Sequence, residues 1–576
     1  MGIGYPQKPA QGDLTHHKTC PKITIDTISS DYFHAGGLGI MTIFYSCLAI
    51  LAVILTGMVI YDLTQKKHAI LRNFPVIGHF RYWLEAIGPE LRQYIVTSDN
   101  EERPFSRAQR RWIYASSKRE NNYFGFGTDN DLELASNHLI VKHSAFPLNT
   151  PTPVDPLYDS EYQLPCAKVM GSYRERRHAF RPTSLINISG MSFGSLSGAA
   201  VEAMNRGAKL AGCLQNTGEG GVSPYHLAGG DLMMQIGSAY FGCRDSQGRF
   251  DLAKLKDVCA AYPIKAVEIK LSQGAKPGVG GLLPASKITK EIAEIRGIPM
   301  GRDCASPANH REFHDVDGML DFVERIADAT GLPVGIKSAV GETRFWTELA
   351  YEMSRTNRGV DFVTIDGGEG GTGAAPLVFA DHVSLPFKIG FARVYREFFE
   401  AGMHQHVIFN GSGRLGFPEN ALFALALGCD MVSVAREAML SIGCIQAQRC
   451  HTGHCPTGVA TQNKWLQRGL DPTSKGVRAA NYIVTLRKEL LGLSHSCGVW
   501  HPGLVTLDHF EILNPGSQSQ AATAMFDQRP EWGLPSPEDQ EAICHIMQTP
   551  PAERDAILTA RRVKREPVPH DFVSVN

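Results

Sequence analysis

Hydrophobic and polar positions follow two contrasting patterns along this chain of 576 residues. Residues 41–61 are almost entirely apolar, and no Asp, Glu, Lys or Arg occurs from residue 33 to residue 61. About 20 consecutive apolar residues can cross a bilayer as a helix, so we predict a transmembrane helix at residues 37–63. Beyond residue 181, short apolar runs alternate with amphipathic stretches, as strands and helices do in an α/β protein.

Eight of these apolar runs are predicted strands separated mostly by helical patterns. Strands and helices in this alternation over about 250 residues predict a single (β/α)8 barrel. A doubly wound sheet is the alternative, but no strand is followed by a G-x-G-x-x-G turn with an acidic residue about 20 positions later. The predicted strands are 184–190, 213–219, 233–239, 266–272, 333–339, 361–367, 406–412 and 430–436.

The segments outside the barrel differ in composition. Residues 1–36 form a polar extension that we expect to be disordered, and residues 501–576 form an irregular tail. Residues 64–160 are a connector with helical segments, and the barrel itself is expected at 161–500. Within the connector, residues 79–96 are amphipathic, which is typical of a membrane-facing surface and equally of a solvated helix packed on the barrel. The predicted fold class is α/β: a (β/α)8 TIM barrel with an N-terminal transmembrane helix and irregular extensions at both ends.

The long apolar stretch has two other interpretations. A signal peptide has a shorter apolar region followed by a clean small-residue cleavage site, which this stretch lacks. A core helix of a soluble protein is rarely apolar on every face. Lys66, Lys67 and Arg72 follow the stretch and favour a cytoplasmic C-terminal side, although Lys18 and Lys22 precede it. We therefore expect a single-pass membrane protein with its barrel in the cytoplasm.

Charge and glycine content narrow the choice of partners. Lys and Arg number 57 against 58 Asp and Glu, so the chain has no excess of positive charge for nucleic acid or another polyanion. Its 57 glycines are many for a globular protein, and glycine gathers where the backbone must approach a ligand closely.

Three cysteines lie close together in the C-terminal third of the chain. Five residues separate Cys444 from Cys450, and four separate Cys450 from Cys455. Three thiols on one short loop can surround an iron–sulfur cluster. Zinc is an alternative, because His451 and His454 add two ligands, although structural zinc sites usually draw ligand pairs from two separated segments. Inert packing thiols are a further alternative.

The predicted strands end in residues suited to binding. In a (β/α)8 barrel the functional groups lie at the C-terminal ends of the strands, and the last two strands lead into phosphate-binding loops. Lys270, Lys276 and Lys337 would converge on one mouth, which favours a dicarboxylate and the electron-rich edge of a reduced flavin. A single strand-end lysine is more often part of a rim salt bridge, so the inference depends on the whole set.

Six motifs in this order carry a family resemblance. They are SGMSFGSLS (189–197), NTGEGG (216–221), IKLSQGAKPGVGG (269–281), DGGEGGTGAAP (366–376), NGSGR (410–414) and the three-cysteine loop. Together they resemble the FMN-binding synthase domain of glutamate synthase, over roughly residues 160–500. The resemblance implies a (β/α)8 barrel that carries FMN and one 3Fe-4S cluster.

The resemblance also implies the ligands of each group. It assigns the cluster to Cys444, Cys450 and Cys455, and the FMN phosphate to Gly411, Ser412, Gly413, Ala435 and Arg436. Along the flavin ring it places Gly190, Met191, Ser192, Asn216, Lys337, Gly367 and Gly368. It maps the substrate pocket to Glu219, Lys270, Gln273 and Arg296, with Glu219, Lys270 and Lys276 as catalytic residues.

The implied reaction is the reductive amination of 2-oxoglutarate to L-glutamate. Ammonia or another amino donor condenses with the keto acid, and reduced FMN delivers hydride to the imine carbon. Glu219 is a candidate for proton handling, because burial can raise the pKa of a carboxylic acid. Electrons would come from an external donor, ferredoxin or a reductase.

The chain departs from large glutamate synthases in several respects. We expect no glutaminase domain, no C-terminal β-helix and no nucleotide-binding reductase in it. Tyr240 stands where the family motif suggests an arginine, which leaves the substrate open. Two alternatives follow: an FMN enzyme on a related amino or keto acid, such as one making N-methylglutamate, and a membrane-anchored electron-transfer subunit without synthase activity. Retention of the expected substrate residues argues against the second, because an electron relay needs no dicarboxylate pocket.

Overall fold

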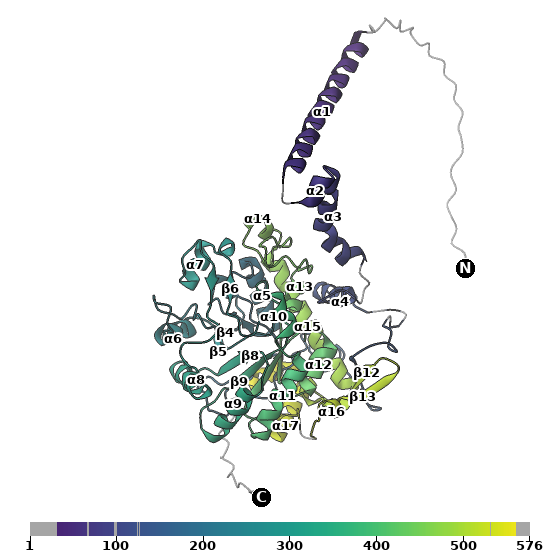
Figure 1. The fold of residues 1–576 in the computed structure, drawn as a ribbon. Coiled ribbons are helices and arrows are strands. Elements are labelled where there is room, and N and C mark those ends of the chain that lie inside the picture. The colour runs from purple at the N-terminus through teal and green to yellow at the C-terminus, as the bar shows by residue number, and fades with distance from the viewer. Residues whose placement is uncertain are drawn as a thin grey trace, which may run out of the picture. The chain divides into compact units, whose positions relative to one another are not determined.

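The computed structural model describes residues 31–65, 68–96, 101–123, 125, 127–128, 130–529 and 532–559. The chain divides into two compact units, Met1–Thr97 and Ser98–Asn576 (Figure 1). Most of the polar extension expected at 1–36 lies outside the described residues, as does the end of the tail beyond residue 559.

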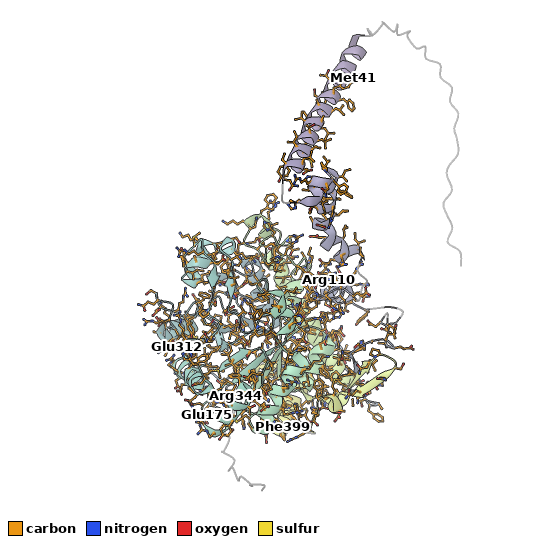
Figure 2. The ribbon with its side chains drawn as sticks, viewed as in Figure 1. Met41, Arg110, Glu175, Glu312, Arg344 and Phe399 are labelled. Carbon is orange, nitrogen blue, oxygen red and sulfur yellow. The ribbon has the colours of Figure 1, made fainter. Side chains whose placement is uncertain are left out.

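The N-terminal unit is helical. Its elements are α1 (Asp31–Thr64), α2 (Ala69–Asn73), α3 (Ile77–Leu91) and a π-helical turn η1 (Arg92–Val96). The 24 residues Met41–Thr64 of α1 form a helix long and apolar enough to cross a membrane, and their side chains project on all sides of it (Figure 2). The helix expected from the sequence is therefore present, while a signal sequence would share its length and composition.

Eight parallel strands close into a barrel in the second unit. In order around the barrel they are β2 (Ile186–Ile188), β3 (Gln215–Asn216), β4 (Leu232–Ile236), β5 (Ile264–Lys270), β8 (Val334–Ser338), β9 (Phe362–Asp366), β10 (Ile408–Ser412) and β11 (Met431–Val434). The barrel closes where β11 pairs with β2, with Val432 opposite Ile186. Each strand overlaps its predicted counterpart, so the (β/α)8 fold is confirmed and the doubly wound alternative is excluded.

Helices surround the barrel (Figure 1). They are α5 (Gly198–Ala211), α6 (Leu252–Ala261), α7 (Lys290–Arg296), α8 (Val316–Thr330), α9 (Arg344–Arg355), α10 (Leu377–His382), α11 (Phe387–Glu400), α12 (Pro418–Ala426), α13 (Arg436–Ser441), α14 (Lys464–Gln467) and α15 (Pro472–Ser496). Local capping defines where several begin: the Ser197 side chain accepts from Ala200 N at α5, and Asp315 accepts from Gly318 N at α8. Their apolar faces cover the strands, which leaves the strand ends as the places for polar chemistry.

Residues 98–160 of the connector and the tail belong to the same compact unit as the barrel, while residues 64–97 of the connector belong to the N-terminal unit. β1 (His138–Val141), from the connector, pairs antiparallel with β12 (Phe510–Asn514), which pairs with β13 (Gln518–Ala521). The other elements are α4 (Arg107–Lys118), α16 (Ala522–Met525), α17 (Pro537–Met547), α18 (Pro551–Thr559), the pair β6 (Leu282–Leu283) and β7 (Cys304–Ala305), and the short helices η2 (Pro224–His226), η3 (Ala285–Lys287), η4 (Pro502–Leu504) and η5 (Leu507–His509).

Candidate active site

A cluster of charged side chains surrounds Glu219 at the C-terminal ends of the strands. Lys270, the last residue of β5, donates from Nζ to Glu219 Oε1 at 2.8 Å and to Gln273 Oε1 at 2.5 Å. Lys276 and Arg296 act electrostatically on the same carboxylate. The structure thus brings together the five residues that the sequence assigned to substrate binding and catalysis.

The cations around Glu219 determine its protonation state. Burial alone would raise the pKa of Glu219, but Lys270, Lys276 and Arg296 outweigh burial and lower it below its ordinary value. This direction is the reverse of the raised pKa that the sequence led us to consider. Glu219 is therefore an anion at neutral pH and holds no proton to donate.

Lys276 and Arg296 are nearly fully buried, at 3% and 5% exposed. Lys276 Nζ donates to Gly280 O at 2.7 Å, and Arg296 Nη2 donates to Phe193 O at 3.0 Å. Arg296 Nε has no hydrogen-bond partner within the part of the chain that the structure describes. Burial lowers the pKa of both side chains, and nearby groups, Glu219 among them, offset this only in part. An anion bound here would stabilise both cations.

Two glycines make room for the Glu219 carboxylate. A Cβ on Gly237 would lie 2.6 Å from Glu219 Oε2, and a Cβ on Gly281 would lie 2.9 Å from Oε1. Any other residue at Gly237 would push the carboxylate away from Lys270.

A second carboxylate, Glu268, lies inside the barrel and was not singled out from the sequence. It precedes Lys270 by two positions on β5 and is 1% exposed. Its Oε2 accepts from Asn216 Nδ2 at 2.7 Å and from Gln235 Nε2 at 2.6 Å, and its Oε1 accepts from Thr364 Oγ1 at 2.6 Å. These bonds satisfy the buried charge and join four barrel strands beneath the mouth.

Lys337 on β8 adds a further buried cation. Its Nζ lies 3.5 Å from Asp366 Oδ2, and that oxygen also accepts from Gly274 N at 3.0 Å. Burial would lower the pKa of Lys337, but Asp366, Glu268 and Glu219 more than compensate and raise it. Lys337 is therefore a permanent positive charge at neutral pH.

The residues expected along a flavin ring all lie at the ends of strands. Gly190, Met191 and Ser192 follow β2, Asn216 ends β3, and Gly367 and Gly368 follow β9. A Cβ on Gly190 would lie 2.8 Å from Asn216 Oδ1, so the backbone here is closely packed. Gly367 N donates to Ser412 O at 2.8 Å, which connects the ends of β9 and β10.

The residues expected to bind phosphate, here called the phosphate loop, lie at the neighbouring C-terminal ends of β10 and β11. Gly411 and Ser412 end β10, Gly413 follows it, and Ala435 precedes Arg436, the first residue of α13. Gly413 has φ +146°, a conformation that other residues rarely adopt.

Two arginines flank this loop, and only one of them was expected. Arg436 donates to the carbonyl of Glu369, and Arg414 directly follows the loop. Both stack on Phe105, with their guanidinium carbons 5.1 Å and 5.3 Å from the ring centroid. Burial lowers the pKa of both, and Arg436 further lowers that of Arg414. Two guanidinium groups in one half-buried place favour an anion beside them, and Glu437 and Glu369 already offset part of their charge.

Cys444, Cys450 and Cys455 lie on one loop after α13, here called the cysteine loop (444–455). Burial raises the pKa of the Cys444 thiol to about 12, and the nearby Cys450 and Cys455 add to the rise. The three thiols are therefore neighbours, but among the described residues no group of three His, Cys, Asp or Glu side chains is placed to hold a metal ion. Neither the cluster nor the zinc alternative is established by this geometry.

The connector segment at α4 holds the cysteine loop, a contact the sequence did not reveal. Gln446 Oε1 accepts from Phe105 N at 3.0 Å, and its Nε2 donates to Phe105 O at 2.9 Å and to Glu102 Oε1 at 3.0 Å. Tyr114 Oη donates to Cys444 O at 2.8 Å. Phe105 thus links the flanking arginines of the phosphate loop to the cysteine loop.

Tyr240, which replaces the arginine expected from the family motif, is fully buried and supports the rim. Its hydroxyl accepts from Arg311 N at 3.0 Å and from Glu312 N at 3.3 Å, and lies 3.2 Å from His310 Nδ1. His310 Nε2 must donate to Lys270 O, 2.9 Å away, because a carbonyl only accepts. Nδ1 therefore accepts from Tyr240, and this chain of bonds fixes the backbone of Lys270.

Comparison with known proteins places this site in a family. A family model of the conserved region in glutamate synthase matches residues 158–500, more than half of the chain. The chain is 38% identical over 491 residues to the glutamate synthase large subunit-like protein YerD of Bacillus subtilis, a match that covers 80% of this chain and 93% of YerD. It is 35% identical to the archaeal glutamate synthase [NADPH] of Methanocaldococcus jannaschii, covering 54% of this chain and 59% of that protein.

Solved structures give weaker likenesses. A flavocytochrome b2 variant with sulfite bound has a TM-score of 0.40 at 14% identity, covering 80% of this chain and 90% of that one. Mandelate oxidase has a TM-score of 0.32 at 16% identity, covering 58% and 80%. At these scores the likenesses say nothing about function. The family match, the relatives and the ordered strand-end motifs agree, and the chain belongs to the glutamate synthase family, a family of oxidoreductases.

Proposed function

We propose that the barrel mouth binds 2-oxoglutarate and reductively aminates it to L-glutamate with the help of bound FMN. The observation that carries this proposal is the charge of the cluster, in which Lys270, Lys276 and Arg296 surround the single carboxylate of Glu219. The excess of two positive charges matches the two carboxylates of 2-oxoglutarate. Membership of the glutamate synthase family supports the same reaction.

The residues present fit FMN. Arg414 and Arg436 offer a half-buried anion site beside the loop between β10 and β11, where phosphate binds in many barrels of this type. Lys337 is a charged lysine at the mouth, suited to the electron-rich edge of a flavin. When bound, FMN would supply the hydride that reduces the imine carbon.

The chain's own residues would bind and orient the keto acid. Arg296 and Lys276 would hold its carboxylates, and the unpartnered Arg296 Nε gives one donor for this purpose. Glu219, as an anion, would stabilise the cationic nitrogen of an iminium by its charge, and its lowered pKa makes it unsuited to act as a proton donor.

The iron–sulfur cluster, the electron donor and the nitrogen source are inferred from the sequence motifs and from the family. We infer that Cys444, Cys450 and Cys455 hold a 3Fe-4S cluster that passes electrons from an external donor, ferredoxin or a reductase, to FMN, with ammonia or another amine as nitrogen source. The clustering of the three thiols supports this, although the loop must rearrange to hold a cluster. The apolar helix Met41–Thr64 supports a single membrane span. Lys66, Lys67 and Arg72 after it favour a barrel on the cytoplasmic side.

A single-turnover measurement tests the reaction. The full-length chain in detergent is loaded with FMN, photoreduced and mixed with 2-oxoglutarate plus ammonia, with 2-oxoglutarate alone, or with 2-oxoglutarate plus methylamine. Rapid flavin reoxidation with formation of glutamate in the first mixture supports the proposal. Turnover only with methylamine would instead identify an N-methylglutamate-forming enzyme, and no turnover in any mixture would favour an electron-transfer subunit.

Iron analysis tests the cluster separately. Cys450→Ser should lose the bound iron and the brown cluster absorption while it keeps FMN. Cys259→Ser, at a half-buried cysteine of α6, is the matched control and should keep both. Unchanged iron in Cys450→Ser would show that the ligand assignment is wrong, and zinc without cluster absorption in the unmodified chain would favour the zinc site.

A further inference from the structure

Helix α3 presents an uncovered apolar face within the N-terminal unit. Its apolar residues recur at positions i, i+3, i+7 and i+14, which places them on one side of a helix. They are Ile77, Phe80, Leu84 and Leu91, with Trp83 at the border, and are exposed by 77%, 59%, 41%, 39% and 56%. Phe80 and Trp83 stack on each other with ring centroids 5.7 Å apart.

The other side of α3 packs against the end of α1 and against α2. His79 Nε2 lies 2.8 Å from Asp62 Oδ1, and Val76 N donates to Asp62 Oδ2 at 2.9 Å. A Cβ on Gly78 would lie 3.0 Å from Leu71, which shows close packing at this point. Asp62 is fully buried at the end of the apolar stretch of α1, and these bonds both satisfy its carboxylate and fix the start of α3. The apolar face is therefore held pointing away from the rest of the unit.

Charge on the same segment favours an anionic surface. From residue 65 to residue 96 the sequence has five Lys and Arg and two Asp and Glu, an excess of three positive charges. A helix with an aromatic and aliphatic face, basic flanks and a direct connection to a membrane span has the character of an interfacial helix.

We propose that α3 lies in the headgroup region of a lipid bilayer, with Phe80, Trp83 and Leu84 inserted at the acyl boundary. The partner is an anionic membrane surface, and α3 is a second membrane contact beside the span. This inference rests on the membrane location proposed above. The bonds of Asp62 hold the start of α3 beside the end of α1, so one bilayer can contact both helices.

Photocrosslinking tests this proposal. The full-length chain carries p-benzoylphenylalanine in place of Phe80 and is reconstituted in vesicles of phosphatidylcholine and phosphatidylglycerol. The matched control carries the same group in place of Glu85, which forms an exposed pair with Arg81 on the same helix. We expect a lipid adduct at position 80 that exceeds the adduct at position 85 by at least about tenfold, because only the first lies on the apolar face. An adduct at position 80 to the protein itself or to a second copy, or equal lipid adducts at both positions, overturns the proposal.

Alkaline carbonate extraction distinguishes this outcome from failure of the span. If the chain stays in the membrane but position 80 gives no lipid adduct, the span stands and the inference about α3 fails. If the chain is extracted while the lipid adduct at position 80 forms before extraction, α3 is a surface contact and the span is wrong. Trp83→Glu should lower the adduct at position 80 severalfold without release of the chain, because it places a charge on the inserted face.

Discussion

The two ends of the barrel both bury clusters of charged side chains, and the clusters differ in balance. At the N-terminal ends of the strands buried cations meet an equal number of carboxylates: Lys168 pairs with Asp430, and Arg174 and Arg176 pair with Asp361 and Glu324. At the mouth three cations, Lys270, Lys276 and Arg296, meet the single carboxylate of Glu219. The first cluster is neutral by this count, while the second has positive charge left for a ligand.

At the first end, Arg176 donates hydrogen bonds from all three of its guanidinium nitrogens. Arg176 donates from Nε to Asp361 Oδ2 at 2.9 Å, from Nη1 to Glu324 Oε2 at 2.6 Å, and from Nη2 to Glu324 Oε1 at 2.9 Å and to Gly359 O at 3.2 Å. Asp361 in turn accepts from Val334 N at 2.8 Å. Arg296 at the mouth donates from Nη2 to Phe193 O, while its Nε, like Arg174 Nε at the first end, has no partner in the described part of the chain. Loss of one partner from a balanced cluster leaves a buried charge uncompensated, whereas an unbalanced cluster has charge to offer a ligand.

The largest expected effect is a loss of stability when a carboxylate is removed from the balanced cluster at the N-terminal ends of the strands. Asp361→Asn leaves Arg174 and Arg176 with too little negative charge in a buried place, which should cost about 3–5 kcal/mol in the free energy of unfolding. Denaturant unfolding of the barrel measures this. Asp317→Asn is the control, because Asp317 pairs with Arg358 at the surface and should cost less than about 1 kcal/mol. Equal effects of the two substitutions would show that the buried cluster has no special role in stability.

At the mouth, loss of a cation should affect binding and spare the fold. Lys276→Met removes a charge whose burial costs more than its attraction to Glu219 returns, so the free energy of unfolding should stay the same or rise. The dissociation constant of 2-oxoglutarate should increase about 10–100-fold, the equivalent of one hydrogen bond to a charged group. Calorimetric titration measures it, with the exposed Lys290→Met as control. If Lys276→Met left the affinity for 2-oxoglutarate unchanged and destabilised the fold, Lys276 would have a structural role like that of the cations at the N-terminal ends of the strands.

The sequence predicted the strands and several residues of the mouth, but it did not predict Glu268 or the direction of the Glu219 pKa shift. All eight strands were predicted, because apolar runs of strand length alternate with helical patterns along the chain. Lys270 and Lys276 were placed at the mouth because they end or follow such a run. Glu268 was missed, since one inward carboxylate in an apolar run gives no local signal. The pKa direction of Glu219 was missed for a different reason: it depends on cations from β5, its following loop and α7, which only the closed barrel brings together.

Contacts between residues far apart in the sequence could not be predicted from it either. Gln446 bonds to Phe105, 341 residues away, and no pattern in either segment predicts the pair. Arg414 stood inside a recognised motif, yet its role beside Arg436 depends on how both stack on Phe105.

A smaller effect is expected when Glu219, the carboxylate between Lys270, Lys276 and Arg296, is neutralised. Glu219→Gln keeps an oxygen for Lys270 and removes the negative charge, so the affinity for 2-oxoglutarate should rise about fivefold, the equivalent of about 1 kcal/mol of Coulomb energy in a partly exposed site. Flavin reoxidation should slow, because no anion then stabilises the iminium nitrogen. Titration and the single-turnover measurement separate the two effects. Weaker keto-acid binding in Glu219→Gln would show that Glu219 accepts a hydrogen bond from the substrate.

The smallest expected effect is a pH dependence of binding. Burial lowers the pKa of Lys276, Glu219 opposes this, and Lys270 adds to the lowering. The protonated lysine is the form that holds a carboxylate, so affinity is complete below this pKa and is lost as the pH rises through it. The loss should therefore begin at a lower pH than the ordinary lysine value of 10.5 would give. Dissociation constants of 2-oxoglutarate measured between about pH 7 and pH 10 test this, and Lys276→Arg should move the loss to higher pH because arginine stays protonated. An identical pH profile in Lys276→Arg would assign the loss to another group and remove Lys276 from the binding site.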